Sequence, residues 1–348
     1  MKRRQFLQNA TVGFTALSLP KFPPFLAETR MGVVVHSYAI RGNPKVESKK
    51  YPGFQNAIEL MEHCHQIGAG GIQVVVKGWS EDFAKKVRER REKLGMYLEG
   101  SIGLPKTAAD VATFETEVKN AKEAGAHILR TVSLGGRRYE TFRTPEAFLE
   151  FKKSATLAIQ LAEPIVRKYQ VKLGIENHKD WLAGELAATL KQLSSEWVGA
   201  TLDFGNNIAL LEDPMTTAQT LAPYLVSTHI KDMAVEEYAS GFLLSEVPLG
   251  KGVLDLSKLI SICKQYNPNV TFNLEMITRD PLEIPCLNND YWATFSGVSG
   301  SELARTLQMV RKNKPKSALP RVAQLSLDEK LAAEEENIVQ SFDYWKQH

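Results

Sequence analysis

The chain has 348 residues, of which 43% are hydrophobic and 24% are charged, as is typical of a globular protein. Its 43 basic and 40 acidic side chains nearly balance, so no electrostatic attraction to nucleic acid or to an anionic membrane is expected. No apolar run reaches the roughly 18 residues that a bilayer span needs. The three cysteines (Cys64, Cys263 and Cys286) are too few, and odd in number, for a disulfide framework.

The first 27 residues have the pattern of an export signal. Arg3 and Arg4 are followed by Phe6 and Leu7 and then by a stretch without charge, which indicates a signal peptide more than a structural helix. The spacing resembles a twin-arginine signal, and a disordered basic N-terminus is the alternative. Residues 1–27 hold four basic and no acidic side chains, so the remainder has 43 − 4 = 39 basic and 40 acidic ones. We therefore expect an exported, periplasmic protein without a membrane span after signal removal.

From residue 28 onward, short β-rich apolar runs alternate with amphipathic helical patterns. The predicted strands span residues 32–37, 71–76, 97–102, 128–133, 172–176, 199–203, 226–230 and 271–276. The predicted helices span residues 54–66, 81–93, 108–124, 145–169, 184–194, 256–266 and 302–312. Such alternation predicts βαβ units and a parallel sheet, and eight units predict an α/β fold closed as a (β/α)8 TIM barrel over residues 28–313. No Gly-rich phosphate fingerprint follows the first strand, which opposes an open nucleotide-binding sheet.

Several predicted helix ends carry local signals. Thr144 before Pro145 is an N-cap followed by proline at the first helical position. Gly68, Gly95 and Gly125 each follow a helical pattern and precede a strand, as glycine does where helices end.

Residues 314–348 are predicted to form a linker and an added C-terminal helix. A Lys/Pro-rich stretch ends near residue 323, and Ser326 with Glu329 has the spacing of a capping box. The candidate docking residues of this helix are Leu327, Leu331, Ile338, Phe342 and Trp345. We expect the helix to cover the barrel or to contact a second subunit in a homo-oligomer.

Four consecutive predicted strands end in polar residues that could meet at one mouth of the barrel. These residues are Glu176, Asp203, His229 and Glu275, and active-site groups of TIM barrels lie at these strand ends. Three carboxylates would repel one another there unless a cation joined them. A lone glutamate often caps a helix and a lone histidine often lies in a core, but the joint placement favours a metal site. An oxygen-rich set with one nitrogen suits Mn²⁺, Mg²⁺, Co²⁺ or Zn²⁺, and no cysteine takes part.

The segments GIENH (174–178), TLDFGN (201–206), HIKD (229–232) and NLE (273–275) resemble the xylose isomerase-like barrel superfamily, also called the sugar phosphate isomerase/epimerase family. The resemblance covers roughly residues 31–312. It implies that the four matching residues bind one divalent metal, often manganese. In the ketose epimerases of the family the two matching glutamates also exchange the substrate proton. The family also contains isomerases, dehydratases, lyases and DNA-repair endonucleases.

The residues themselves support proton transfer on a carbohydrate. A metal that binds a carbonyl and an adjacent hydroxyl acidifies the C–H bond between them and stabilises the enediolate. Glu176 and Glu275 come from the fifth and eighth strands, so they can approach a sugar from different directions. We predict them as the acid/base pair, with Asp203 and His229 mainly holding the metal.

Polar residues near the predicted ligands are candidates for binding sugar hydroxyls. They are His36, His178, Asn206, Lys231 and Arg279. Each of three has a structural alternative: His36 as a barrel-core residue, Lys231 paired with Asp232, and Arg279 paired with Asp280. Trp181 and Phe204 are predicted either to form an apolar wall for a sugar or to pack in the core.

The predicted function is a metal-dependent sugar isomerase or epimerase. The alternative is a lyase that uses the same proton abstraction to expel the aglycone of a 3-keto-glycoside. Export favours the lyase because free sugar phosphates are chiefly cytoplasmic, and the long loop at 278–292 favours a larger substrate. An abasic-site endonuclease is opposed by the small number of histidines, seven in total, and by the nearly neutral charge. A non-catalytic sugar-binding protein is opposed by the intact acidic ligands.

Overall fold

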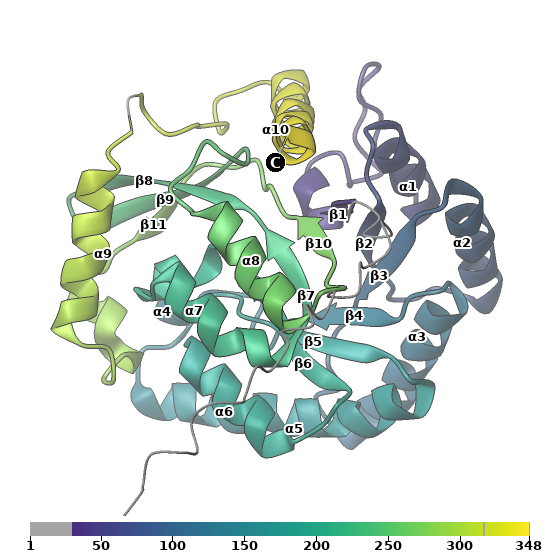
Figure 1. Ribbon diagram of the computed structural model, residues 1–348, viewed down its shortest axis with the longest axis horizontal. Helices are drawn as coiled ribbons and strands as arrows, with labels where there is room; N and C mark the ends of the chain where they lie inside the picture. The colour runs from purple at the N-terminus through teal and green to yellow at the C-terminus, as the bar shows by residue number, and fades with distance from the viewer. Residues whose placement is uncertain (1–29, 316, 348) are drawn as a thin grey trace, which may run out of the picture.

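The computed structural model describes residues 30–315 and 317–347, so the predicted signal at 1–27 lies outside the described residues. Eight parallel strands close a barrel in the order β1-β10-β7-β6-β5-β4-β3-β2 (Figure 1). The strands are β1 (Gly32–Val34), β2 (Gly71–Val75), β3 (Tyr97–Ser101), β4 (Ile128–Thr131), β5 (Lys172–Glu176), β6 (Val198–Asp203), β7 (Leu225–Ile230) and β10 (Phe272–Leu274). Each of these strands overlaps a predicted strand in sequence, which confirms the TIM barrel.

The strands are buried because helices cover their outer face and side chains fill the interior. All six residues of β6 are buried, as parallel strands covered on both faces require. Close packing inside the barrel also selects small residues. A Cβ at Gly174 of β5 would collide with the hydroxyl of Thr201 on the neighbouring strand β6.

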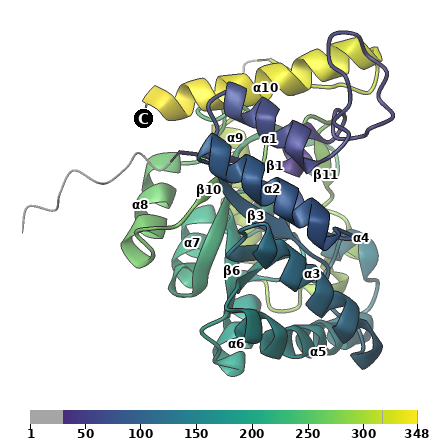
Figure 2. The same cartoon turned by 90° about the vertical axis from the view of Figure 1, so that its right-hand side faces the viewer.

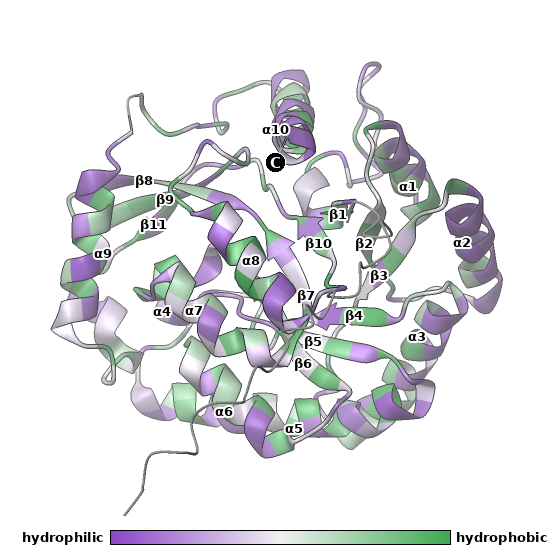
Figure 3. Ribbon diagram, in the orientation of Figure 1, coloured by the Kyte–Doolittle hydropathy of each residue, from purple (hydrophilic) through white to green (hydrophobic). Residues whose placement is uncertain are grey.

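Helices surround the barrel, and their outward faces are polar. Six of the predicted helices are α1 (Ala57–Gln66), α2 (Glu81–Leu94), α3 (Val111–Glu123), α5 (Pro145–Tyr169), α6 (Ala183–Leu193) and α8 (Leu256–Tyr266). The helices α4 (Arg138–Thr141) and α7 (Pro214–Leu221) were not predicted. Figure 2 shows α1, α2 and α3 side by side on one flank, and Figure 3 shows much of α2 as hydrophilic. The Thr144 hydroxyl accepts from the backbone N–H of Ala147, and Gly95 ends α2 at a φ of 63°, so both predicted end signals are confirmed.

A second, antiparallel sheet was not predicted. It has the order β11-β9-β8 and consists of β8 (Asp232–Tyr238), β9 (Gly241–Val247) and β11 (Leu282–Ile284). The helix α9 (Gly300–Lys312) packs on β8 and β9. Because β8 and β9 are inserted between β7 and α8, this sheet elaborates the carboxyl end of the barrel, where the predicted site lies (Figure 1).

The last helix, α10 (Leu327–Gln347), docks on the barrel as predicted. Ile338 and Phe342 belong to the barrel's apolar cluster, and the Trp345 ring lies 5.5 Å from that of Phe272. Leu327 is 43% exposed, so its predicted docking role is wrong. Ser326 and Glu329 form the predicted reciprocal hydrogen bonds ahead of the helix.

Two further findings concern the described residues only. None of their helices is both long enough and apolar enough to cross a membrane. Cys64, Cys263 and Cys286 are free and buried, as the absence of a disulfide framework predicts.

Candidate active site and metal centre

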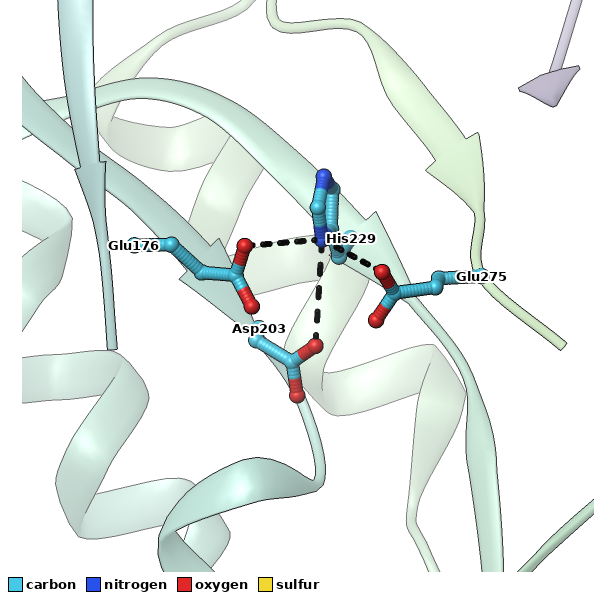
Figure 4. A group of neighbouring side chains, drawn as sticks. All are labelled: Glu176, Asp203, His229 and Glu275. Atoms are coloured by element: carbon cyan, nitrogen blue, oxygen red, sulfur yellow. Dashed lines mark ion pairs between the residues drawn. The ribbon is translucent and has the colours of Figure 1, made fainter. Parts of the chain in front are cut away.

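The four predicted ligands converge at the carboxyl end of the barrel. Glu176 and Asp203 end β5 and β6, His229 lies near the end of β7, and Glu275 directly follows β10. Each offers one ligand atom, and these atoms all lie within 4.8 Å of one another. All four residues are buried. Figure 4 shows the three carboxylates pointing toward the imidazole. The fold therefore brings together the residues that strand order alone had placed near each other.

The imidazole of His229 is oriented by the hydrogen bond on its far side. Its Nε2 donates to Oε1 of Gln73 at 2.8 Å. Its Nδ1 lies 3.4 Å from Glu176 Oε2, 3.9 Å from Asp203 Oδ2 and 3.6 Å from Glu275 Oε1 (Figure 4). A histidine that donates through one nitrogen presents the lone pair of the other, as metal-ligating histidines commonly do.

The hydrogen bonding of two atoms in this cluster indicates whether the site fits a metal ion. Nδ1 of His229 and Oδ2 of Asp203 are buried and make no hydrogen bond, although Lys231 Nζ is 2.8 Å from the carboxylate oxygen. Buried polar atoms without hydrogen bonds are costly and uncommon. One divalent cation between them would satisfy both atoms. The residues therefore fit such an ion, and the oxygen-rich ligand set suits Mn²⁺ or Mg²⁺.

Two buried protein cations also hold the carboxylates together. The Lys231 ammonium lies 2.6 Å from Glu275 Oε2 as well as beside Asp203. The Arg130 guanidinium contacts Oε2 of Glu176 through two nitrogens. The expectation that only a bound ion could relieve carboxylate repulsion is therefore wrong, because Arg130 and Lys231 relieve part of it. Three carboxylates against two cations leave one negative charge, 3 − 2 = 1, which the proton on His229 balances when no metal is bound.

These contacts set the protonation of the ligands. Burial would raise the pKa of Glu176, but Arg130 and His229 hold that pKa well below its usual range. Burial opposes ionisation of Glu275 in the same way, and Lys231 and His229 hold its pKa well below its usual range. Burial lowers the pKa of His229, but Glu176 and Glu275 outweigh burial and raise it to about 9. Ionised carboxylates are the form that binds a cation, which must displace a proton from His229.

A cavity of about 310 Å³ opens onto the cluster. It is lined by Gly135, Gly136, Arg137, Glu140, His178, Lys179, Glu275, Ile277 and Arg279. Of the four candidate ligands, only Glu275 lines this cavity. Glu176 lies behind it, held by Arg130 and by the side-chain amide of Asn206, which donates to its Oε1 at 3.0 Å. The two predicted proton carriers therefore differ in their access to a substrate in this cavity.

Of the residues predicted to bind sugar, His178 and Arg279 line the cavity. His178 donates from Nδ1 to the carbonyl of Leu134 at 3.0 Å, which leaves Nε2 as an acceptor. Burial lowers the pKa of His178 to about 4, so the ring is neutral at pH 7. Arg279 forms a double hydrogen bond with Glu246 of β9, so the predicted pair with Asp280 is wrong.

Asp280 instead accepts from the backbone N–H groups of Val322 and Ala323, at 2.6 and 3.0 Å. It therefore anchors the segment before α10 and leaves Arg279 to face the cavity. This loop carries β11, so it is more ordered than the sequence suggested.

The other predicted sugar contacts lie closer to the ligands. His36 lies in a short 3-10 helix after β1, and its Nδ1 is 3.3 Å from Glu275 Oε1. Its side chain is 41% exposed, so the alternative of a barrel-core residue is wrong. Asn206 and Lys231 are buried and contact the ligands themselves. The suggested pair of Lys231 with Asp232 is wrong, because Asp232 accepts from backbone N–H groups of four residues: Met233, Gly250, Gly252 and Leu254.

Trp181 and Phe204 are core residues. Both are buried within the barrel's apolar cluster, and Trp181 packs against the ring of Phe151. Their predicted alternative, an apolar wall for a sugar, is wrong because neither lines the cavity above the ligands.

A set of buried polar residues beneath the ligands was not predicted. Glu99 accepts from the Gln73 amide at 3.0 Å and from the Ser227 hydroxyl at 2.8 Å. Gln73, Glu99 and Arg130 lie inside strands that otherwise read as apolar runs. A charged or amide residue in such a run was the available signal, because the interior of a strand rarely holds one without a partner.

Comparisons with known proteins agree with this architecture. A family model described as xylose isomerase-like TIM barrel matches residues 61–294. A 3-oxo-isoapionate decarboxylase from Pectobacterium atrosepticum is 26% identical over 258 residues, 72% of this chain and 88% of that protein.

Two solved structures share the fold at low identity. An L-ribulose 3-epimerase has a TM-score of 0.56 and 13% identity, with 92% of this chain and 96% of that one covered. A xylose isomerase-like TIM barrel protein from Mycobacterium smegmatis in complex with magnesium has a TM-score of 0.55 and 15% identity, with 80% and 97% covered.

Proposed function

The chain belongs to the xylose isomerase-like TIM barrel family, and we propose that it is a divalent-metal-dependent sugar isomerase or epimerase. The reaction is the transfer of a proton next to a carbonyl group of the substrate. The observation that carries this proposal is the buried cluster in which three carboxylates surround His229 Nδ1, an atom without a hydrogen bond. A structural polar network would satisfy this nitrogen within the protein.

Glu176, Asp203, His229 and Glu275 would hold the ion, with Mn²⁺ favoured and Mg²⁺, Co²⁺ or Zn²⁺ as alternatives. When bound, a divalent cation polarises a substrate carbonyl and acidifies the neighbouring C–H bond. The protein contributes an already oriented ligand set, because Gln73, Arg130 and Lys231 hold His229, Glu176 and Glu275 in place.

Glu275 is the proton carrier on the open side of the site, because its carboxylate both lines the cavity and contacts His36 and Lys231. Glu176 takes part from the β5 side. His178 accepts a hydrogen bond from a substrate hydroxyl through Nε2, which its bond to Leu134 leaves available. The cavity of about 310 Å³ admits a small carbohydrate.

A lyase that acts on a 3-oxo sugar is the second candidate, and one observation favours it. Only Glu275 of the two glutamates lines the cavity, and an elimination needs one base on one face of the substrate. In a 3-keto-glycoside the base takes the C2 proton, the electron pair forms a C1–C2 double bond and the C1–O bond breaks. The similarity to a 3-oxo-isoapionate decarboxylase also supports a 3-oxo substrate. Export by the twin-arginine route is part of this proposal, because it gives access to glycosides outside the cytoplasm.

The test is an activity screen of the Mn²⁺-loaded protein against ketoses and 3-keto-glucosides. A rearranged sugar supports the isomerase or epimerase, and release of the aglycone supports the lyase. The variant that tests the metal site is Asp203→Asn, which removes the charge of one candidate ligand and no cavity-lining group. Turnover that survives both complete removal of divalent ions and this substitution contradicts the proposal.

A further inference from the structure

Lys179 lies in the wall of the cavity next to Glu275, and its side chain is buried at 4% exposure. Its Nζ donates to Oδ1 of Asn206, which uses one of the three N–H donors of the ammonium. No carboxylate oxygen of the described residues lies within 4.0 Å of this Nζ. Lys179 is thus a buried cation whose only hydrogen-bond partner among the described residues is a neutral amide.

The other charged residues around the cavity are paired. Arg279 forms its double hydrogen bond with Glu246, Arg137 lies 2.5 Å from Glu140, and Glu275 lies 2.6 Å from Lys231. Lys179 therefore contributes one positive charge to the cavity without a carboxylate in direct contact, although Glu246 and Asp203 act on it from farther away.

The backbone holds Lys179 firmly in this place. Its φ is 65°, in the left-handed region that lysine seldom adopts. Its carbonyl accepts from the N–H of Arg138 at 2.9 Å. The next residue, Asp180, accepts from the N–H groups of His178 and Leu134, at 3.1 Å in both cases. The ammonium is consequently preorganised, so a ligand need not pay for ordering the chain.

We propose that Lys179 binds a carboxylate of the substrate, so that the enzyme acts on a sugar acid that also carries a keto group. This rests on the proposed function, because it takes the cavity above the metal ligands as the substrate site. A buried cation is costly without a counter-ion, and a carboxylate supplies one negative charge and acceptors for the two remaining N–H groups. Burial lowers the pKa of Lys179 to about 8, so the group is still mostly charged at pH 7.

A phosphate ester is the other anion that a lysine commonly binds. It carries about two negative charges and three strong acceptor oxygens at neutral pH, whereas Lys179 has one positive charge and two remaining N–H donors. The two oxygens of a carboxylate match these donors more closely.

The experiment compares D-gluconate, D-glucitol and D-glucitol 6-phosphate as probes of the Mn²⁺-loaded, full-length protein by calorimetry at pH 7. We expect gluconate to bind at least about 10-fold more tightly than glucitol, the usual scale of a charge-assisted hydrogen bond. In Lys179→Gln, which keeps a donor for Asn206, this ratio should fall to about one. Lys179→Arg and Lys191→Gln, an exposed lysine of α6, should retain it.

Three outcomes overturn the inference. They are equal binding of gluconate and glucitol by the wild type, a gluconate preference that persists in Lys179→Gln, and tighter binding of the phosphate than of gluconate. The second would mean that the carboxylate binds the metal ion. Equal binding of gluconate and glucitol by the wild type overturns the inference even if the variants fail to fold.

A prior titration with Mn²⁺ alone separates this inference from the proposed function. If the wild type binds no Mn²⁺, the proposed function fails. If Mn²⁺ binds and Asp203→Asn abolishes that binding, but gluconate is not preferred, only the assignment of Lys179 fails.

Discussion

Gln73 accepts a hydrogen bond of 2.8 Å from Nε2 of His229, and the same amide donates to Glu99 at 3.0 Å. The imidazole is therefore oriented from below by a buried network, while its other nitrogen faces the three carboxylates. Because the orienting partner is itself fixed, the ring is ready to bind an ion without rearrangement.

The substitution Gln73→Leu should weaken Mn²⁺ binding about 10–100-fold, the usual cost of removing the hydrogen-bond partner of a ligating histidine. Calorimetric titration of the metal-free protein with Mn²⁺ measures the affinity. Ser227→Ala is the matched control, because it removes another hydrogen bond to Glu99 and leaves the partner of His229 intact. Equal Mn²⁺ affinity in Gln73→Leu and the wild type would show that Gln73 does not orient the ligand.

Glu275→Gln and Glu176→Gln should each lower turnover by more than about 100-fold, since an acid/base group contributes this much or more. Steady-state kinetics with the substrate found in the screen tests the prediction. Glu283→Gln, at an exposed position of β11, is the control for a lost carboxylate outside the site. Near-normal rates in both active-site variants would exclude these residues as proton carriers.

Arg130→Met should lower the free energy of unfolding by about 3–5 kcal/mol, because it leaves the buried Glu176 carboxylate without its cation. The two side chains are 6% and 0% exposed, so solvent cannot replace the lost partner. Urea unfolding at pH 7 without metal measures the change. The double variant Arg130→Met/Glu176→Gln should recover most of the loss, and an equal loss in both variants would argue against the ion pair as its cause.

The stability of the protein should depend on the ionisation of Glu334. Burial raises the pKa of this glutamate from 4.5 to about 7, although the N–H groups of Ile40 and Arg41 partly oppose the rise. Because the folded chain holds the proton more tightly than the unfolded chain, protonated Glu334 contributes its full stabilisation of the fold below about pH 4.5. It is lost as the pH rises through about 7.

We expect the loss from Glu334 to reach up to about 3 kcal/mol. Glu334→Gln cannot ionise and should lack this part of the pH dependence. Urea unfolding of both proteins over this pH range gives the comparison, and parallel pH profiles would contradict the assignment.

Removal of divalent ions should lower the melting temperature, because an ion that binds only the folded state stabilises it by mass action. At a Mn²⁺ concentration 100 times the dissociation constant the gain is about 2.7 kcal/mol. Thermal unfolding with Mn²⁺ and with a chelator gives the shift. Asp203→Asn should show little shift, and a shift of equal size in that variant would place the ion elsewhere.

The barrel and its ligand set could be predicted because both depend on local pattern. Each strand is a short apolar run, and polar residues at successive strand ends must meet when the sheet closes. Thus Glu176, Asp203 and His229 could be placed together without knowing any distance. The partners of these residues depend on register between strands, which local pattern does not contain. Arg130 is paired with Gly174 in the register of β4 and β5, and only this brings it beside Glu176.

The hairpin β8–β9 was missed for a different reason. Only Lys231 separates β7 from β8, so the end of one strand and the start of the next merge in the sequence. The helix α7 had a signal that was not used, since the Asp213 side chain caps it and Pro214 opens it.

The contact of Glu334 with Ile40 and Arg41 joins positions 294 and 293 residues apart. These two residues adjoin the 3-10 helix that carries His36, which contacts Glu275. During synthesis, the first loop of the barrel must therefore wait for nearly the whole polypeptide to emerge before it gains this anchor. Folding that depends on such long loop closures is slow, and a nascent chain stalled before α10 would leave the early loop open to proteases.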